Sequence, residues 1–326
     1  MPESNTVQIP SSDYQPQIVC NPDGTYTRLL QVPTVPASPD PNQSTSSVVS
    51  KDIPINPSKQ TWLRIYLPRR ALDSSSTAHN LPLIVYYHGG GFILLSAASC
   101  VTHDFCLLMS EQLDAVVISV DYRLAPEHRL PAAYEDAIEA LHCISTSEED
   151  WLRKFTDLSS CFLMGTSAGG NIAYHAGLRA CEQVEELEPL KIKGLILHHP
   201  YFGGLERTGS ELKMVKDPIL PLSGNDLMWE LSLPVGADRD HEYSNPMAGR
   251  GSNMFEDVRA NGLRILVTGC HGDPLIDRQV EFANMLEEKG VRTVAHFGEG
   301  CHSVELIEMS KADSLFVVIK DFMFCF

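Results

Sequence analysis

The amino-acid sequence is poor in positive charge and has no long apolar run. Its 326 residues carry 25 Lys and Arg against 42 Asp and Glu, for a net charge of −17. Because so acidic a surface repels nucleic acids and anionic membranes, we expect neither as a partner. No apolar run approaches the roughly 20 residues that span a bilayer. The first residues also lack a basic region followed by an apolar core, the pattern of a secretory signal, so we expect a cytoplasmic protein, with the nucleus as a second compartment.

Motifs for metals, nucleotides and disulfides are missing as well. The nine cysteines are odd in number and form no Cys-x-x-Cys pair, which favours reduced thiols. No spacing of Cys and His resembles a zinc site, and no Gly-x-Gly-x-x-Gly opens a helix. The glycine run 89–91 lacks the Lys-Ser/Thr ending of a phosphate-binding loop. The sequence therefore predicts no metal and no cofactor, and it says nothing about the oligomeric state.

Apolar strand patterns alternate with helical patterns over most of the chain. The strict alternation of 61–67 predicts a strand with one face in a core. The order predicts an α/β fold, a single domain over 1–326 with a mostly parallel, doubly wound sheet. Segments at about 1–47 and 201–260 break the order and are predicted to form a helical cap over the carboxyl ends of the strands. Apolar runs predict buried strands at 81–87 and 115–120, and further strands are predicted at 192–198, 264–268 and 292–297. Helical spacing occurs at 105–113, 132–144, 278–289 and 308–326.

A Gly-Thr-Ser-Ala-Gly pentapeptide at 165–169 is the centre of the sequence. Glycine and serine also make ordinary turns, so the pattern alone does not identify a site. Here an apolar strand pattern precedes it and a helical pattern follows, which is the context of a nucleophile elbow. The sequence therefore predicts that Ser167 is presented as a nucleophile at the carboxyl edge of a sheet.

A serine hydroxyl needs a base to take its proton and an acid to orient that base. In α/β-hydrolases the chain order is serine, acid, histidine. Asp273 follows the predicted strand 264–268, and His302 follows the last predicted strand. Both loops lie at the sheet edge that carries Ser167, so we expect Ser167, Asp273 and His302 to form a catalytic triad.

Other residues compete for these two roles. His271 precedes the acid rather than following the last strand. His198 and His199 form an adjacent pair, which we expect to line the pocket or to pack. Asp277 competes with Asp273, but its place at the start of a helix predicts that it caps free backbone donors there.

The reaction also needs donors for the negative charge that develops on the substrate oxygen. The run His-Gly-Gly-Gly-Phe at 88–92 follows a predicted strand and leaves backbone N–H groups uncovered. We expect Gly89 and Gly90 to form the oxyanion hole together with Ala168, which follows the nucleophile.

These motifs give the chain a resemblance to plant carboxylesterases of the hormone-sensitive-lipase type, within the α/β-hydrolases. The resemblance covers nearly the whole chain and implies the same triad and oxyanion donors. It also implies that the cap selects the substrate and that 121–131 is structural. It rests on His-Gly-Gly-Gly-Phe at 88–92, Asp-Tyr-Arg-Leu-Ala-Pro-Glu at 121–127, Gly-Thr-Ser-Ala-Gly-Gly-Asn at 165–171, Asp-Pro-Leu-Ile-Asp at 273–277, and His302.

Two positions depart from this family's usual pattern. Thr166 stands where an acidic residue is usual, and Cys301 stands where a bulky residue usually precedes the histidine. Neither change removes a triad member. Both alter the surroundings of the reacting groups.

The leading hypothesis is a serine carboxylesterase that hydrolyses small-molecule carboxylic esters through an acyl-enzyme. A lyase or cyclase of plant specialised metabolism on the same scaffold is the alternative, since relatives of this family eliminate a leaving group. A hormone-receptor-like binding module is a third reading, and the presence of His302 argues against it.

An apolar pocket requires residues beyond the catalytic loops. We expect it from Leu227, Met228 and Trp229, and from an N-terminal segment that folds over the site through Tyr14, Tyr26, Leu29 and Leu30.

Overall fold

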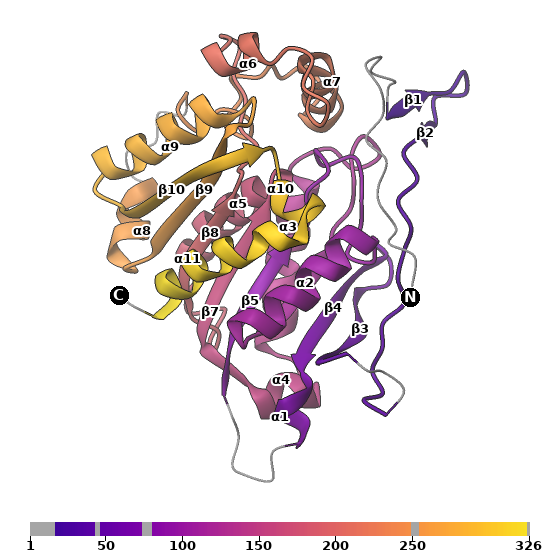
Figure 1. Ribbon diagram of the computed structural model, residues 1–326, viewed down its shortest axis with the longest axis vertical. Helices are drawn as coiled ribbons and strands as arrows, with labels where there is room; N and C mark the ends of the chain where they lie inside the picture. Colours follow the sequence, from indigo (N-terminus) through magenta and orange to yellow (C-terminus); the bar gives the residue numbers. More distant parts are fainter. Residues whose placement is uncertain (1–16, 43–45, 74–79, 249–253, 325–326) are drawn as a thin grey trace.

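The computed structural model describes residues 17–42, 46–73, 80–248 and 254–324, and within them an eight-stranded sheet organises the chain (Figure 1). The strand order is β10-β9-β8-β7-β5-β6-β4-β3, with β5 to β10 parallel and β3 and β4 antiparallel at one edge. The mostly parallel sheet predicted from the sequence is confirmed. The strands are β3 (Val48–Asn56), β4 (Thr61–Pro68), β5 (Leu81–Tyr87), β6 (Val116–Asp121), β7 (Thr156–Thr166), β8 (Ile192–His198), β9 (Arg264–Gly272) and β10 (Arg292–Cys301).

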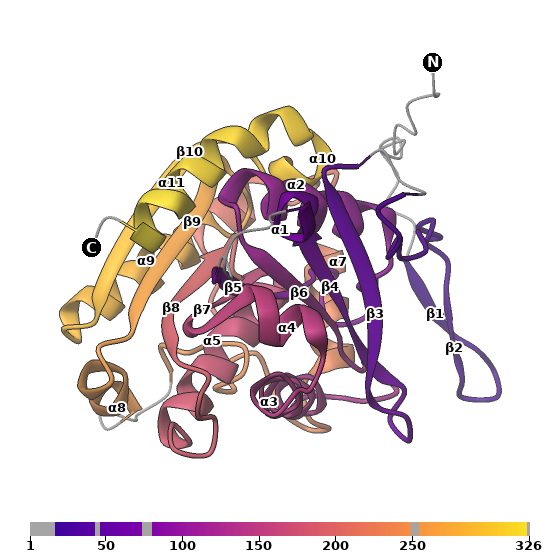
Figure 2. The ribbon, with the colours of Figure 1, turned by 90° about the horizontal axis from the view of Figure 1, so that it is seen from below.

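Helices cover both faces of this sheet (Figure 2). Side chains of α3, α5, α8 and α9 join the core on one face, and those of α2 and α11 join the core on the other. No helix among the described residues is long and apolar enough to cross a membrane. The helices are α1 (Arg69–Asp73), α2 (Cys100–Leu113), α3 (Ala132–Ser145), α4 (Asp150–Phe155), α5 (Ala168–Glu182), α6 (Gly209–Lys213), α7 (Leu222–Ser232), α8 (Met254–Ala260), α9 (Ile276–Glu288), α10 (Val304–Ile307) and α11 (Ala312–Phe324).

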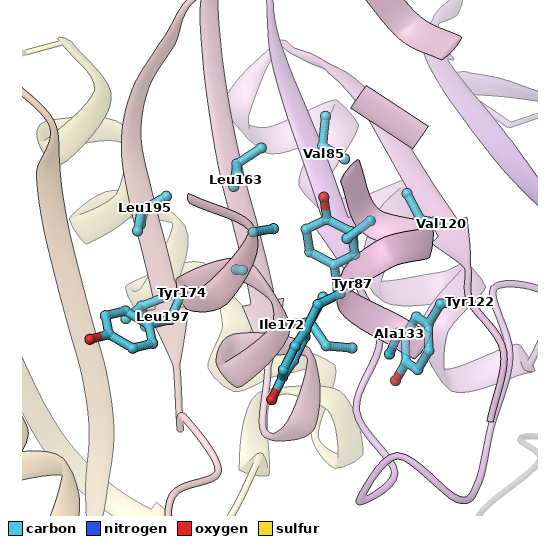
Figure 3. Close-up of a cluster of buried hydrophobic side chains, with 14 of the residues drawn as sticks. Val85, Tyr87, Val120, Tyr122, Ala133, Leu163, Ile172, Tyr174, Leu195 and Leu197 are labelled. Carbon is cyan, nitrogen blue, oxygen red and sulfur yellow. The ribbon is translucent and has the colours of Figure 1, made fainter. Parts of the chain in front are cut away.

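The central strands are apolar throughout because both of their faces are buried. On β5, Val85 and Tyr87 belong to one core while Ile84 and Tyr86 belong to the other. In Figure 3 the first core is seen between β5, β7 and β8 and the helix α5, which contributes Ile172. Successive side chains of a strand point to opposite faces of the sheet. Because both faces are buried here, every position is apolar, and the sequence shows a continuous apolar run.

The prediction that strand 61–67 has only one buried face is wrong. β4 is buried on both faces, and Arg64 has only 2% of its surface exposed. The guanidinium donates to both carboxylate oxygens of Asp52, at 2.6 and 2.8 Å, and to the carbonyl oxygen of Val35 at 2.7 Å. A charged side chain can therefore occupy an inward position, because its hydrogen bonds are satisfied there.

The helices α6 and α7 and a small hairpin lie at the end of the molecule toward which the parallel strands point (Figure 1). The hairpin pairs β1 (Ile18–Cys20) with β2 (Tyr26–Arg28). Helix α8, which falls in the predicted cap range 201–260, lies at the opposite end. It packs against α5 and leads into the start of β9.

Arg28 anchors this hairpin to the body of the protein. Its guanidinium forms two hydrogen bonds with the carboxylate of Glu127, at 2.8 and 2.6 Å, and donates to the carbonyl oxygens of Ile93 and Ala125. The leucines expected to hold this segment, Leu29 and Leu30, are instead 51% and 41% exposed. Tyr26 is half-buried, and Tyr14 lies outside the described residues. The anchor therefore combines these ionic contacts with the burial of Ile18, which is 3% exposed, in the main core.

The segment 121–131 has the structural role that the resemblance implied. Arg123 donates to both carboxylate oxygens of buried Asp136, and Glu127 holds Arg28. Asp121, at the end of β6, accepts the backbone N–H of Ala97 at 2.8 Å.

Replacing Asp121 with asparagine is expected to flatten the pH dependence of stability between about pH 4 and pH 6. Burial raises the pKa of the Asp121 carboxyl from 3.8 to about 6, so the folded protein binds this proton more tightly than the unfolded chain. The free energy of unfolding therefore falls by about 3 kcal/mol as the pH rises through this window. Urea unfolding of both proteins from about pH 4 to pH 7 isolates this component as their difference. A difference that does not change with pH would contradict the expectation.

Candidate active site

The turn from β7 into α5 places Ser167 in a conformation that few L-residues adopt. Its φ is 57° and its ψ is −119°, and its backbone N–H donates to the carbonyl oxygen of His198 at 2.9 Å. The flanking glycines are required sterically. A Cβ on Gly165 would lie 2.0 Å from the carbonyl oxygen of Gly169, and one on Gly169 would lie 1.8 Å from that of Tyr87. This is the geometry of a nucleophile elbow.

Three residues predicted from the sequence meet at this elbow. Nε2 of His302 lies 2.9 Å from the hydroxyl oxygen of Ser167, and Nδ1 of His302 lies 2.8 Å from Oδ2 of Asp273. Ser167 is 7% exposed, His302 is 4% exposed, and Asp273 is fully buried. The three side chains come from loops that follow β7, β9 and β10, which are brought to one edge because these strands run parallel.

Asp273 is ionised although it is buried. Burial alone would raise the pKa of its carboxyl, but the charges of His302 and His199 and their hydrogen bonds lower that pKa well below its usual range. Oδ1 accepts the backbone N–H of Leu275 at 2.8 Å. Oδ2 also accepts from Gln279 at 2.9 Å. The carboxylate is therefore fixed in orientation on both oxygens.

The glycine-rich loop lies beside the nucleophile. A Cβ on Gly89 would be 3.4 Å from the Cβ of Ser167. Among the described residues, the backbone N–H groups of Gly89 and Gly90 have no intramolecular acceptor. Ala168 is the first residue of α5, where a backbone N–H has no partner within the helix. These N–H groups are available to a ligand.

His88 makes this loop rigid. Its ring stacks on Tyr122 at 4.3 Å, and its Nδ1 lies 2.8 Å from the carbonyl oxygen of Gly89. The Tyr122 hydroxyl donates to the His88 carbonyl oxygen at 2.7 Å. Burial lowers the pKa of His88 to about 4, so this ring is a neutral support.

Comparison with known proteins decides the identity. The profile of the alpha/beta hydrolase fold family matches residues 84–305. The chain belongs to this family. It is 50% identical to carboxylesterase 20 of Arabidopsis thaliana over 94% of both chains. It is 45% identical to a 3-O-acetylpapaveroxine carboxylesterase of Papaver somniferum, over 92% of this chain and 95% of that one.

Solved structures agree with this assignment. A hyperthermophilic esterase from the archaeon Pyrobaculum calidifontis superposes with a TM-score of 0.69 and 29% identity, over 84% of each chain. The protein is thus a plant-type carboxylesterase, a serine hydrolase that cleaves esters. The family, the fold and the general activity expected from the sequence are confirmed.

In this carboxylesterase, α7 closes over the glycine-rich loop. A Cβ on Gly91 would lie 2.3 Å from the sulfur of Met228, so the methionine side chain contacts that loop directly. The hydroxyl of Ser232 donates to the Gly91 carbonyl oxygen at 3.2 Å. Leu227 is half-buried, whereas Trp229 is fully buried and stacks on Tyr201 at 4.5 Å. Met228 therefore makes a direct contact with the loop, and Trp229 packs behind it.

The residues that competed for the triad roles lie elsewhere or act differently. His271 is exposed. Asp277 does not cap its own helix as predicted, since its carboxylate accepts the backbone N–H of Ser210 on α6 at 2.7 Å. His198 packs on Phe105, but His199 Nδ1 lies 2.8 Å from Oδ2 of Asp273. The sequence offered one signal for this contact, a histidine pair at the end of the strand next to β9.

The two unusual positions of the esterase differ in their surroundings. The Thr166 hydroxyl accepts from the buried Tyr86 hydroxyl at 2.9 Å, so its side chain enters the core rather than facing the reacting groups. Cys301 is half-buried, and burial raises the pKa of its thiol. Thr166 thus satisfies the Tyr86 hydroxyl with a neutral side chain, whereas an acidic residue at this position would place a charge in the core.

Proposed function

We propose that the esterase works through an acyl-enzyme formed on Ser167, with His302 as general base and acid and Asp273 as its positioning carboxylate. The observation that carries the proposal is the continuous pair of contacts, 2.9 Å from Ser167 to His302 and 2.8 Å from His302 to Asp273. With its Nδ1–H donated to Asp273, the neutral His302 ring presents the Nε2 lone pair to the serine hydroxyl.

The proposed reaction has two halves. Ser167 Oγ attacks the ester carbonyl carbon as its proton passes to His302 Nε2. The backbone N–H groups of Gly89, Gly90 and Ala168 stabilise the resulting oxyanion. The tetrahedral intermediate then expels the alcohol, which takes the proton from His302. A water molecule repeats the sequence on the acyl-enzyme and releases the carboxylic acid.

We propose short-chain acyl esters of small alcohols, acetyl esters above all, as the substrate class. Two observations support this proposal. The contact between Met228 and Gly91 leaves little room beside the oxyanion donors, and the Papaver somniferum relative is named for an acetyl ester. Leu227 and the anchored N-terminal hairpin are the proposed contacts for the alcohol portion.

The test is a substrate panel with product analysis. The panel contains aryl acetate, butyrate and octanoate esters together with acetylated plant metabolites. The proposal expects free carboxylic acid and intact alcohol in equal amounts, with acetate and butyrate turned over faster than octanoate. An alkene or cyclised product in place of the alcohol would instead support elimination chemistry. A preference for octanoate would contradict the short-chain assignment.

Shortening Met228 is expected to change the acyl preference more than the basal rate. Met228→Ala opens space beside Gly91, so kcat/KM for the octanoate ester relative to the acetate ester should rise by about tenfold. Leu212→Ala on α6 is the matched control, because that side chain is 59% exposed, and it should leave the ratio unchanged. Parallel changes across the whole series would show that α7 only supports the fold.

A further inference from the structure

A second histidine, His199, contacts Asp273 beside His302. Nδ1 of His199 is 2.8 Å from Oδ2 of Asp273, the same oxygen that receives Nδ1 of His302. The two imidazole rings are 5.4 Å apart and nearly perpendicular. His199 has no exposed surface, so it acts on the site only through its neighbours.

The far nitrogen of this ring faces a second carboxylate. Nε2 of His199 lies 3.4 Å from Oε2 of Glu305, which lies in the chain's next helix, α10, three residues after His302. Nε2 of His198 lies 3.3 Å from the same oxygen. The side chains thus form a continuous line from Glu305 through His199, Asp273 and His302 to Ser167.

The positions of the protons follow from these contacts. The Asp273 carboxylate only accepts, so Nδ1 of His199 carries a proton. If Nε2 carried none, its lone pair would face the Glu305 carboxylate in a buried site, which is repulsive. His198 does not need a second proton, because the Thr268 hydroxyl, 2.8 Å from its Nδ1, can donate to that nitrogen. With Glu305 ionised, as its lowered pKa favours, the positive charge of the cluster belongs on His199.

The groups around His199 agree with this distribution. Burial disfavours its charged form, but the hydrogen bond with Asp273 and the nearby Cys270 and Glu305 side chains outweigh burial and raise the pKa of His199 well above its usual range. Burial lowers the pKa of His198. Interactions with the two histidines lower the pKa of Glu305 well below its usual range, despite burial. The titratable groups that face His199 are His198 on β8, Cys270 on β9, Asp273 in the β9–α9 loop, His302 in the β10–α10 loop and Glu305 on α10.

We propose that His199 is a permanent imidazolium that bridges Asp273 and Glu305 and acts as a positioning residue for the triad. Its charge offsets one of the two carboxylates, so that His302 gives up its proton readily enough to serve as a base. When His302 takes the proton of Ser167, the buried cluster has two positive and two negative charges. This inference rests on the proposed triad.

A charge-compensation series tests the proposal. His199→Gln keeps an N–H donor near Asp273 but removes the positive charge, so His302 should hold its proton more tightly. The acidic limb of the kcat/KM profile is then expected to move to higher pH by about one to two units. The double variant His199→Gln with Glu305→Gln removes one charge of each sign and should return the limb to within about half a unit of wild type. Glu308→Gln, which alters an exposed carboxylate paired with Lys311, is the control and should leave the profile unchanged.

A merely structural role predicts a different pattern. In that case kcat/KM falls in His199→Gln without a shift of the acidic limb of its pH profile, and the double variant is no more active than His199→Gln alone. Either result would overturn the proposal. Titration with a serine-directed phosphonate counts the folded active sites, so that a loss of folded protein is not mistaken for a loss of rate. Retained activity in Ser167→Ala would refute the proposed triad. The pH-profile measurements on the His199 variants test the role of His199 separately.

Nitrogen-15 spectra of histidine-labelled wild-type protein give a direct readout that needs no variant to be active. One imidazolium signal should persist to about pH 8, well above the usual histidine range. Loss of every imidazolium signal by that pH would overturn the proposal. Ligand-type atoms of His198, His199 and Glu305 lie within 4.8 Å of one another, so a divalent cation is the competing source of charge. Stoichiometric zinc in the purified protein, with activity lost to a chelator, would also overturn it.

Discussion

Replacing Ser167 with alanine is expected to lower kcat/KM for any ester by roughly four to six orders of magnitude without unfolding the protein. The Ser167 hydroxyl lies 2.9 Å from Nε2 of His302, and the acyl-enzyme cannot form without it. The helix α5 and the flanking glycines keep their packing, because alanine fits where serine does. The measurement is kcat/KM for an aryl acetate, with circular dichroism on the same samples.

Ser119→Ala is the matched control for this loss. Ser119 is likewise a buried serine, but it lies on β6, away from Asp273 and His302. Its replacement should leave kcat/KM within about twofold of wild type. Activity of Ser167→Ala within tenfold of wild type would show that another residue supplies the nucleophile.

Asp273→Asn is expected to cost about four orders of magnitude in kcat/KM, whereas Asp277→Asn should cost less than about tenfold. Asp273 Oδ2 receives N–H groups from His302, His199 and Gln279. An asparagine amide would oppose some of these donors with its own, and His302 would lose the partner that sets its tautomer. Asp277 has instead a bond to the backbone of Ser210 on α6.

The two variants are to be compared in matched kinetics at the same pH, after equal folding has been established by thermal unfolding. Asp277→Asn should show a small loss of stability, about 1 kcal/mol, from the weakened bond to α6. The opposite ranking of the two activities would mean that Asp277, not Asp273, orients the base.

Sequence alone could predict the sheet and the meeting of the catalytic loops. Apolar runs define the parallel strands, and parallel strands bring their following loops to one edge. This is why Ser167, Asp273 and His302 can be grouped from the amino-acid sequence, although they are far apart in the chain. The glycine requirement at the elbow could likewise be anticipated, since Gly165 and Gly169 have no space for a Cβ.

What the sequence could not predict depends on side-chain partners from distant elements. Arg64 has the sequence pattern of a solvent-facing residue, but Asp52 and Val35 satisfy its guanidinium in the interior. Asp277 has the position of a helix cap, but a neighbouring helix takes its carboxylate. His199 and Glu305 carry no motif, and only the fold brings them to Asp273 and to each other. Periodicity reports which face is buried, and it says nothing about which polar partner is buried there.

Detection of the acyl-enzyme on Ser167 tests the proposed mechanism most directly. Wild-type enzyme is mixed with a slow acetyl ester, quenched in acid during turnover, digested and analysed by mass spectrometry. We expect an acetyl group on the peptide that contains Ser167, with the modification on that serine, and no such adduct in Ser167→Ala treated in the same way. An acetyl group on a different residue, or an unmodified peptide in an enzyme shown to be turning over in the same sample, would contradict it.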